Sequence, residues 1–203
     1  MPPPKADRPV FLIVAGPNGS GKSTSYTDTE IEQSGRTIWI VNPDLLTARI
    51  QQVEDLPLLD SNRAAVQRIE AWLESSIDVH KSVGVEKVLS TPKYRRLVTK
   101  AKGLGFAFWL VYVVLDTPER NIERVRKRVR KGGHDVPEDK IRARYARSLE
   151  QFPWFLGQAD EAWIYDNSGA QPRRIGEKSG GVIALSEAAL PTVLEAVRSV
   201  ETE

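Results

Sequence analysis

The segment from Gly16 to Ser23 reads Gly-Pro-Asn-Gly-Ser-Gly-Lys-Ser and fits the phosphate-binding pattern G-x-x-x-x-G-K-S/T, here called the P-loop. Its glycines allow backbone N–H groups to turn toward a chain of phosphates. Lys22 supplies a positive charge for the β- and γ-phosphates, and the hydroxyl of Ser23 is the expected Mg²⁺ ligand. The residues predicted to bind the nucleotide here are Gly16, Asn18, Gly19, Ser20, Gly21, Lys22, Ser23 and Thr24.

The residues on either side of the P-loop distinguish it from an ordinary glycine-rich turn. Residues 10–15 form a short apolar run, which is typical of a buried parallel strand. A helix is predicted from residue 24 to about residue 33, and its positive N-terminal end would point at the phosphates. Strand, loop and helix therefore follow one another as a phosphate site requires.

Strands and helices alternate along the rest of the chain. Apolar runs predict strands at 37–41, 85–89, 106–115 and 162–165, with a small hairpin at 173–185. Caps and helical periodicity predict helices at 62–82, 91–103, 118–131, 137–150 and 190–200. Residues 45–59 show no clear pattern, and Gly84 is expected to end a helix. This order predicts an α/β fold, a mostly parallel sheet with helices on both faces and strand 106–115 at its centre.

The composition is that of an ordinary globular protein. The 203 residues are 40% hydrophobic and 28% charged, which is enough for one domain at 10–203 after a flexible segment at 1–9. The absence of cysteine excludes disulfides and thiolate metal sites and fits a reducing compartment, so a cytoplasmic location is expected. The longest apolar run, 106–115, is too short to cross a membrane, so no membrane partner is expected.

Two carboxylates are candidates for chemistry at the carboxyl edge of the sheet. Asp44 follows strand 37–41, and ligands of open α/β sheets bind at that edge, where the P-loop also lies. It can accept the proton of an acceptor hydroxyl or help to position Mg²⁺, unless it is only a turn residue. Glu86 lies in a strand and needs a partner, which can be Mg²⁺, the acceptor or a basic residue. The alternative is a strand-edge Glu that pairs with Lys87.

Residues 120–147 contain eleven Lys and Arg residues, although the net charge of the chain is only +2. Their four-residue spacing places Arg120, Arg124 and Arg128 on one helix face. After Gly132-Gly133 the pattern returns at Lys140, Arg144 and Arg147. Two basic helices around a glycine hinge predict a lid at about 120–150 that closes over a triphosphate. The alternatives are a solvated surface and a nucleic-acid patch, and the small net charge disfavours nucleic acid.

Two polar residues beside these elements are further candidates. His134 in the hinge can contact the substrate, although such a residue often only caps or packs. Asn167 follows the last core strand and can contact the base of the nucleotide; the alternative is a plain turn.

The chain resembles the zeta-toxin-type P-loop kinases, especially the branch described as predicted ABC-type ATPases or kinases. The resemblance runs from about Val10 to Ser168 and is carried by the segments 16–24, 42–44, 86–94 and 132–149. It implies a kinase-like three-layer α/β fold and phosphoryl transfer from ATP with Mg²⁺. For toxin members of the family the acceptor is a UDP-amino-sugar, and an antitoxin-like protein partner is implied.

Matching positions carry the roles of individual residues over from the family. The resemblance implies that Lys22 and Ser23 hold phosphates and Mg²⁺, and that Asp44 activates the acceptor hydroxyl. It implies that Glu86 binds the acceptor or orders the site. The lid arginines that it implies are Arg128, Arg144 and Arg147. The chain departs from the family pattern after the strand Glu, where Lys87 replaces the expected Thr.

The leading hypothesis is a kinase of a small molecule. A nucleotide-dependent ATPase or switch and a polynucleotide kinase are the alternatives. The sequence contains neither the N-K-x-D segment of a GTPase switch nor the L-S-G-G-Q segment of an ABC transporter subunit. It does not name the acceptor.

Overall fold

The computed structural model of the chain describes residues 8–25, 38–133 and 135–201. Across these residues a seven-stranded sheet has the order β2-β3-β1-β4-β5-β6-β7. The strands are β1 (Val10–Ala15), β2 (Trp39–Val41), β3 (Val83–Lys87), β4 (Ala107–Val114), β5 (Glu161–Asp166), β6 (Arg173–Ser179) and β7 (Val182–Leu185). Neighbouring strands among β1 to β5 pair in parallel, whereas β6 pairs antiparallel with β5 and β7 pairs antiparallel with β6. The predicted α/β fold with a mostly parallel sheet is confirmed, and so is the hairpin at its end.

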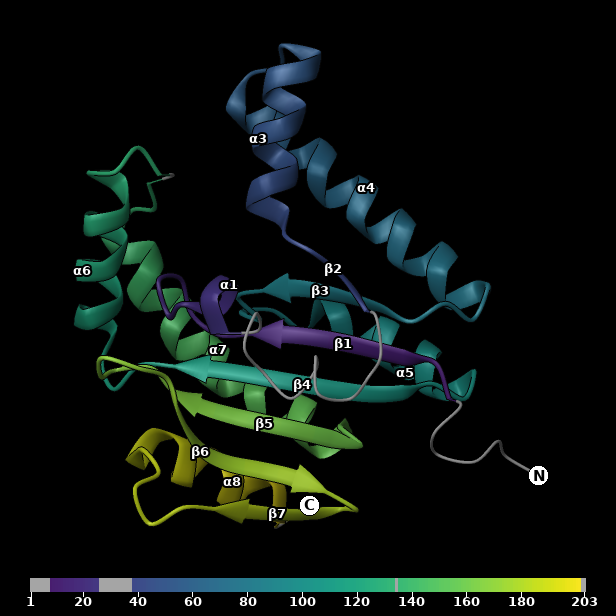
Figure 1. The fold of residues 1–203 in the computed structure, drawn as a ribbon, viewed down its shortest axis with the longest axis vertical. Coiled ribbons are helices and arrows are strands. Elements are labelled where there is room, and N and C mark those ends of the chain that lie inside the picture. The colour runs from purple at the N-terminus through teal and green to yellow at the C-terminus, as the bar shows by residue number, and fades with distance from the viewer. Residues whose placement is uncertain (1–7, 26–37, 134, 202–203) are drawn as a thin grey trace.

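Strands β1 and β4 form the centre of the sheet because both are apolar along their whole length. Every residue of β1 is buried, and β4 is buried except at the partly exposed Trp109. Figure 1 shows β1, β3, β4 and β5 pointing the same way, toward α6. The carboxyl ends of the parallel strands therefore meet at one edge, as predicted for the ligand site.

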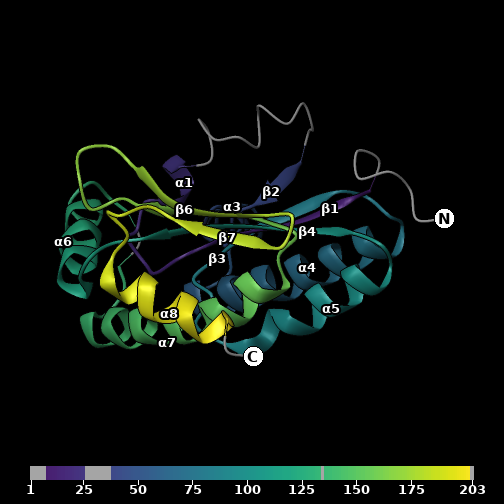
Figure 2. The ribbon, with the colours of Figure 1, turned by 90° about the horizontal axis from the view of Figure 1, so that it is seen from below.

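The helices that form the main core pack against one face of the sheet. They are α4 (Leu58–Asp78), α5 (Arg95–Gly103), α7 (Glu138–Gln158) and α8 (Pro191–Glu201). Figure 2 shows these four on one side of the sheet and α1 (Lys22–Ser25) on the other. The remaining helices are α3 (Pro43–Glu54), the 3-10 turn η1 (Pro92–Tyr94) and α6 (Pro118–Val129). Helix α3 and the start of α4 extend beyond the sheet (Figure 1).

Helix α3 is the element that the sequence pattern missed. Residues 45–59 showed no clear apolar periodicity, yet a helix begins at Pro43. Its start is set locally, because the Asn42 side chain accepts hydrogen bonds from the N–H groups of Asp44 and Leu45, and proline suits the first helical position. Among its buried residues Ile50 is the apolar one, which explains the weak pattern.

Three predicted boundaries were wrong. Helix α4 ends at Asp78, four residues before the predicted end, and the chain turns at His80 with φ 55°. Gly84 does not end a helix but lies in β3, where a Cβ would approach Ile40 to 3.0 Å. Helix α7 continues to Gln158 through Pro153 rather than ending near residue 150. Burial of Phe152, Phe155 and Leu156 in the core offsets the cost of a proline inside a helix.

Several predictions fall on residues outside those described. They are most of the flexible segment 1–9, most of the first helix after the P-loop, and His134. Within segment 1–9, Arg8 donates hydrogen bonds to the carbonyls of Gly105 and Phe106. None of the helices in the described ranges combines the length and the hydropathy that a membrane span requires.

Candidate active site

The P-loop joins the end of β1 to the start of α1, and its glycines are required by close contacts. Gly16 has φ 144°, and a Cβ there would lie 2.0 Å from the carbonyl oxygen of Val113. Gly19 has φ 77°, and a Cβ there would lie 2.7 Å from the carbonyl oxygen of Asn121. No other residue type fits these two positions without moving the backbone, so the loop has one well-defined shape.

Two buried asparagines hold the P-loop from outside. Asn121 of α6 donates to the carbonyl oxygen of Asn18 (2.6 Å), and Asn167 after β5 donates to that of Ser20 (2.8 Å). Asn167 was predicted to contact the base of the nucleotide. Its amide nitrogen instead donates to the P-loop, and contact of this residue with a base stays a prediction. Asn121 was missed, because it lies in a polar stretch of sequence that does not mark it.

Lys22 is buried at the inner side of the loop. Its ammonium group donates to the carbonyl oxygens of Gly16 (2.9 Å) and Pro17 (3.0 Å). Burial lowers the pKa of Lys22, while the negative charges of Glu86 and Asp44 act in the opposite direction and Arg128 adds to the lowering. The charges of the other predicted site residues therefore act on the Lys22 ammonium. Phosphate oxygens would compete with the carbonyl oxygens of Gly16 and Pro17 for its hydrogen bonds.

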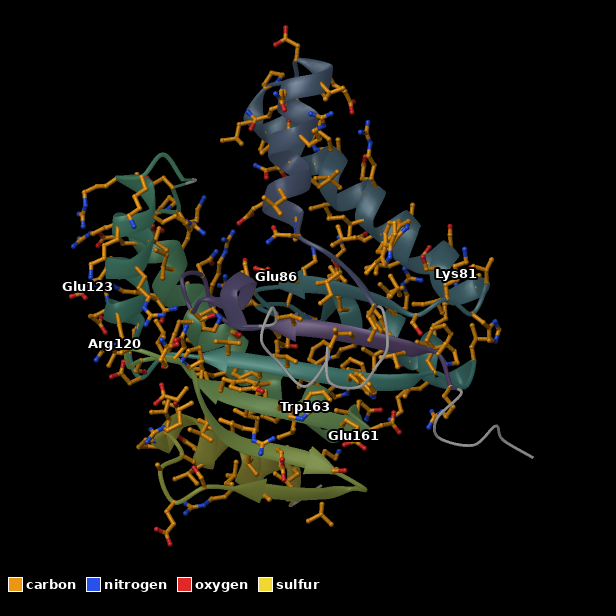
Figure 3. The ribbon with its side chains drawn as sticks, in the orientation of Figure 1. Lys81, Glu86, Arg120, Glu123, Glu161 and Trp163 are labelled. Carbon is orange, nitrogen blue, oxygen red and sulfur yellow. The ribbon has the colours of Figure 1, made fainter. Side chains whose placement is uncertain are left out.

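Glu86 is the centre of a small network that joins three elements. One of its carboxylate oxygens accepts from the Ser23 hydroxyl (2.9 Å) and from the Asn42 amide (2.9 Å). The described hydrogen-bond partners of Glu86 are thus Ser23 and Asn42 rather than Lys87, and its role toward Mg²⁺ or the acceptor stays a prediction. Figure 3 shows Glu86 beside α1, whereas Arg120 and Glu123 project from α6 away from α1.

The donor set around Ser23 fits Mg²⁺. The oxygens there are the Ser23 hydroxyl and the Glu86 carboxylate, and Mg²⁺ prefers oxygen ligands and keeps several waters and substrate phosphates. In the described part of the chain no three His, Asp or Glu residues gather as a metal site of their own. Ser23 would thus hold the ion together with phosphate oxygens, while Glu86 orients its hydroxyl.

A cavity of about 370 Å³ brings most of the predicted site residues together. Its nucleotide half is defined here as the P-loop residues with the two arginines beside them: Asn18, Gly19, Lys22, Ser23, Arg128 and Arg144. Asp44 and Glu86 line the same cavity. Its acceptor half is defined as Val66, Glu70, Lys87, Val88, Leu89, Ser90, Thr91, Lys93 and Tyr94.

The structure separates the three predicted lid arginines. Arg128 and Arg144 line the cavity, and Arg144 donates to the side chain of Asn18 (3.3 Å). A Cβ on Gly133 would lie 2.5 Å from Cγ of Arg128, so this glycine allows the chain to pass close to the Arg128 side chain. Arg147 is exposed and does not line the cavity.

Other basic residues of segment 120–147 are paired with acids at the surface. Arg120 pairs with Asp116, Arg126 with Glu138 and Arg142 with Glu119. These pairs consume part of the positive charge that suggested a nucleic-acid patch. The arginines that line the cavity are thus distinct from those that stabilise the surface of α6 and α7.

The acceptor half contains titratable groups that the P-loop chemistry does not use. Lys87 lies over the ring of Tyr94, with its ammonium 4.9 Å from the ring centroid. Burial is the main cause that lowers the pKa of Lys87 to about 8; Lys93 acts in the same direction, and Glu70 and Asp44 act against it. Burial also raises the pKa of Tyr94. The loop turns here at Leu89, which has φ 60°, a conformation that costs energy for a leucine.

Two predicted residues have no described position in this site. His134 lies outside the described residues, and the side chain of Thr24 does as well. Their predicted contacts with substrate and nucleotide stay predictions.

Comparisons with known proteins agree with this fold. A family model described as AAA domain, AAA_33, matches residues 11–152. A protein of Haemophilus influenzae described as uncharacterized is 28% identical over 137 residues, which are 66% of this chain and 91% of that protein.

Solved structures share the fold at low identity. A crystal structure of AvrRxo1-ORF1:-ORF2 with ATP has a TM-score of 0.70 and 16% identity, and covers 94% of this chain; this chain spans only 63% of that one. A structure from the PezAT chromosomal toxin–antitoxin system of Streptococcus pneumoniae has a TM-score of 0.61 and 15% identity, and covers 96% of this chain and 78% of its own.

Proposed function

The chain belongs to the AAA domain family AAA_33 and has the fold of zeta-toxin-type P-loop kinases, and from this premise we propose that it transfers the γ-phosphoryl group of ATP to a hydroxyl of a small molecule. The observation that carries the proposal is the single cavity that joins the P-loop, Asp44 and two arginines to a separate acceptor half. A nucleotide-dependent switch needs only the nucleotide half of the cavity.

Asp44 is the proposed general base. It is exposed in the first turn of α3 and lines the cavity, and its backbone is fixed by the Asn42 cap (2.9 Å). The acceptor oxygen bonds to the γ-phosphorus while the bond from that phosphorus to the β–γ bridging oxygen breaks, and ADP leaves. The hydroxyl proton passes to the Asp44 carboxylate.

Positive side chains stabilise the charge on the transferring group. Lys22 is held at the loop, and Arg128 and Arg144 line the same cavity, so all three could contact the γ-phosphate. Mg²⁺ held by Ser23 would neutralise phosphate charge when bound. Closure of segment 120–150 would exclude water and so favour transfer over hydrolysis.

A protein partner of the antitoxin kind is a second part of the proposal. The two structural neighbours come from a two-protein complex and a toxin–antitoxin system. In this chain helices α3 and α4, which extend beyond the sheet, expose Leu45, Val53 and Leu59. A partner that co-purifies from the native host with the wild-type chain and is lost with Leu59→Asp would support this part; equal recovery with both would contradict it.

Substitution of Asp44 tests the proposed reaction. In an assay of γ-³²P transfer to small alcohols, nucleotide-sugars and 5′-hydroxyl oligonucleotides, Asp44→Asn should lower transfer at least about a hundredfold while ATP still binds. Asp60→Asn is the matched control, because Asp60 is also a first-turn acid but lies outside the cavity.

The other outcomes of this assay separate the alternatives. Rescue of Asp44→Asn by high Mg²⁺ would assign Asp44 to the metal instead. Transfer only to oligonucleotides would favour a polynucleotide kinase, and ATP hydrolysis without transfer to any acceptor would favour an ATPase. Full activity of Asp44→Asn at ordinary Mg²⁺ would remove Asp44 from the reaction.

A further inference from the structure

Position 87 links the two halves of the cavity. Lys87 is the last residue of β3 and lies opposite Ala15 of β1 in the sheet register. Its carbonyl oxygen accepts the N–H of Gly16 (3.2 Å), so its backbone supports the first residue of the P-loop. Its side chain lines the cavity on the acceptor side. The backbone from which the Lys87 side chain extends is therefore fixed next to the P-loop.

Of the two lysines in the acceptor half, Lys93 has an ion-pair partner and Lys87 has none among the described residues. Lys93 of η1 forms an ion pair with Glu70 of α4. Among the residues that the structure describes, no carboxylate lies within ion-pair distance of the Lys87 ammonium, although Glu70 and Asp44 act on it from farther away. Its contact is the ring of Tyr94 at 4.9 Å. A largely buried ammonium group is costly unless an anion or an aromatic ring faces it.

The loop after β3 adds hydroxyl groups to the same wall. Leu89 adopts its left-handed conformation with its side chain buried, and Ser90 and Thr91 follow it along the cavity wall. Hydroxyls beside an ammonium group are the donors that bind the oxygens of phosphate or carboxylate. Lys22 already serves the nucleotide phosphates in the other half, which leaves Lys87 for the acceptor.

We propose that the acceptor carries an anionic group, a phosphate or a carboxylate, that binds the Lys87 ammonium while Asp44 receives the reacting hydroxyl. The proposal rests on the proposed function, because it assigns the second half of the same cavity. Lys87 is thus a specificity residue, and an uncharged alcohol of the same size leaves the ammonium without its partner.

Protection from amine labelling tests the proposal without knowledge of the acceptor. The full chain is saturated with Mg²⁺ and a non-hydrolysable ATP analogue, and is acetylated with and without inorganic phosphate or tricarballylate; a sample without the analogue is acetylated in parallel. Mass spectrometry then follows labelling at Lys22, Lys87 and Lys81. Lys81 is an exposed control that lies between α4 and β3, far from Glu86 (Figure 3).

Slower labelling of Lys87 with either anion, and none at Lys81, is the expected result. Phosphate and tricarballylate together tell which of the two anionic groups the site prefers. Equal labelling with and without both anions would overturn the proposal, and so would a lack of any labelling at Lys87, which would show that the cavity does not reach the amine. Failure of the nucleotide analogue to protect Lys22 would instead contradict the proposed function.

Charge variants test the same proposal in transfer assays. Matched alcohols are compared, such as glycerol with glycerol 3-phosphate and glycerate, using Lys87→Met, Lys87→Arg and the control Lys81→Met. Lys87→Met should raise KM for the charged acceptor at least about tenfold with little change in ATP affinity, and Lys87→Arg should restore part of the loss. A loss of ATP affinity in Lys87→Met would place the ammonium on the nucleotide and overturn the proposal.

Discussion

The two halves of the cavity are built in different ways. The nucleotide half is one continuous loop, held by its own glycines and by the amides of Asn121 and Asn167, to which α6 and α7 add Arg128 and Arg144. The acceptor half takes its charged groups from three separate elements, with Glu70 on α4, Lys87 on β3 and Lys93 on η1. On the proposed function, the first half would recognise phosphate through backbone geometry that a short motif encodes. The second would recognise its ligand through side chains that only the fold brings together.

Loss of Lys22 should have the largest effect, because it removes the central charge of the nucleotide half. Lys22→Ala should weaken ATP binding and lower transfer at least about a thousandfold for every acceptor, since the ammonium contacts both bound ATP and the transition state. Calorimetry of ATP binding and the γ-³²P assay measure the two effects. Transfer at the wild-type rate would show that the P-loop does not bind the phosphates of the reacting nucleotide.

The arginines provide the next contrast, since some line the cavity and others lie outside it. Arg128→Ala and Arg144→Ala should each lower transfer about a hundredfold. Arg126→Ala and Arg142→Ala remove surface ion pairs and should change it little. Arg147→Ala separates the resemblance from the structure: a large loss would support the family role, whereas the exposed position predicts a small one. Single-turnover rates distinguish these outcomes.

The nucleotide half could be predicted from the sequence because its geometry is local. Gly16, Lys22 and Ser23 are fixed within eight residues, and the adjoining strand was confirmed as well. Asp44 was predicted from its place after a strand, since parallel strands end at one edge of the sheet. The structure places it on the cavity wall, although its role as a base stays a proposal.

The rest of the site could not be read from the sequence because it depends on contacts between distant segments. Asn121 reaches Asn18 across 103 positions, and no local pattern marks it. Glu70 lies on a helix, and its pairing with Lys93 is set by how α4 packs beside η1. Lys87 was noticed only as a departure from the family pattern, and its surroundings become visible only in the fold.

Removal of the Asn121 amide should weaken the nucleotide half without removing any ligand contact. Asn121→Ala leaves the buried carbonyl oxygen of Asn18 without its donor, which should cost about 1 to 3 kcal/mol of unfolding free energy. ATP affinity should fall several-fold, because the loop is less well held. Denaturant titration and ATP binding measure both effects. Equal stability would show that the loop keeps its shape through its glycines alone.

The smallest effect concerns the stability cost of the Lys87 ammonium in the acceptor half. Burial lowers its pKa to about 8 in the folded protein from an ordinary value of 10.5. Between these pH values the unfolded chain binds more protons than the folded chain, so the wild type gains stability as pH rises from 8 toward 10.5. Below pH 8 the full penalty remains. Lys87→Met keeps the apolar stem and lacks the charge, so it should unfold at a higher temperature than the wild type at pH 7, by about 2 to 4 °C for each kcal/mol gained.

This advantage of Lys87→Met should shrink as pH rises toward 10, while Lys81→Met, at an exposed site, should track the wild type throughout. Thermal unfolding at several pH values measures the difference. A wild type that is more stable than Lys87→Met at pH 7 would mean that the ammonium already has a stabilising partner within the protein. A wild type that is less stable than Lys87→Met at pH 7 would mean that the Lys87 charge does not stabilise the fold. Such a cost to stability is expected of a residue that is retained to bind a ligand.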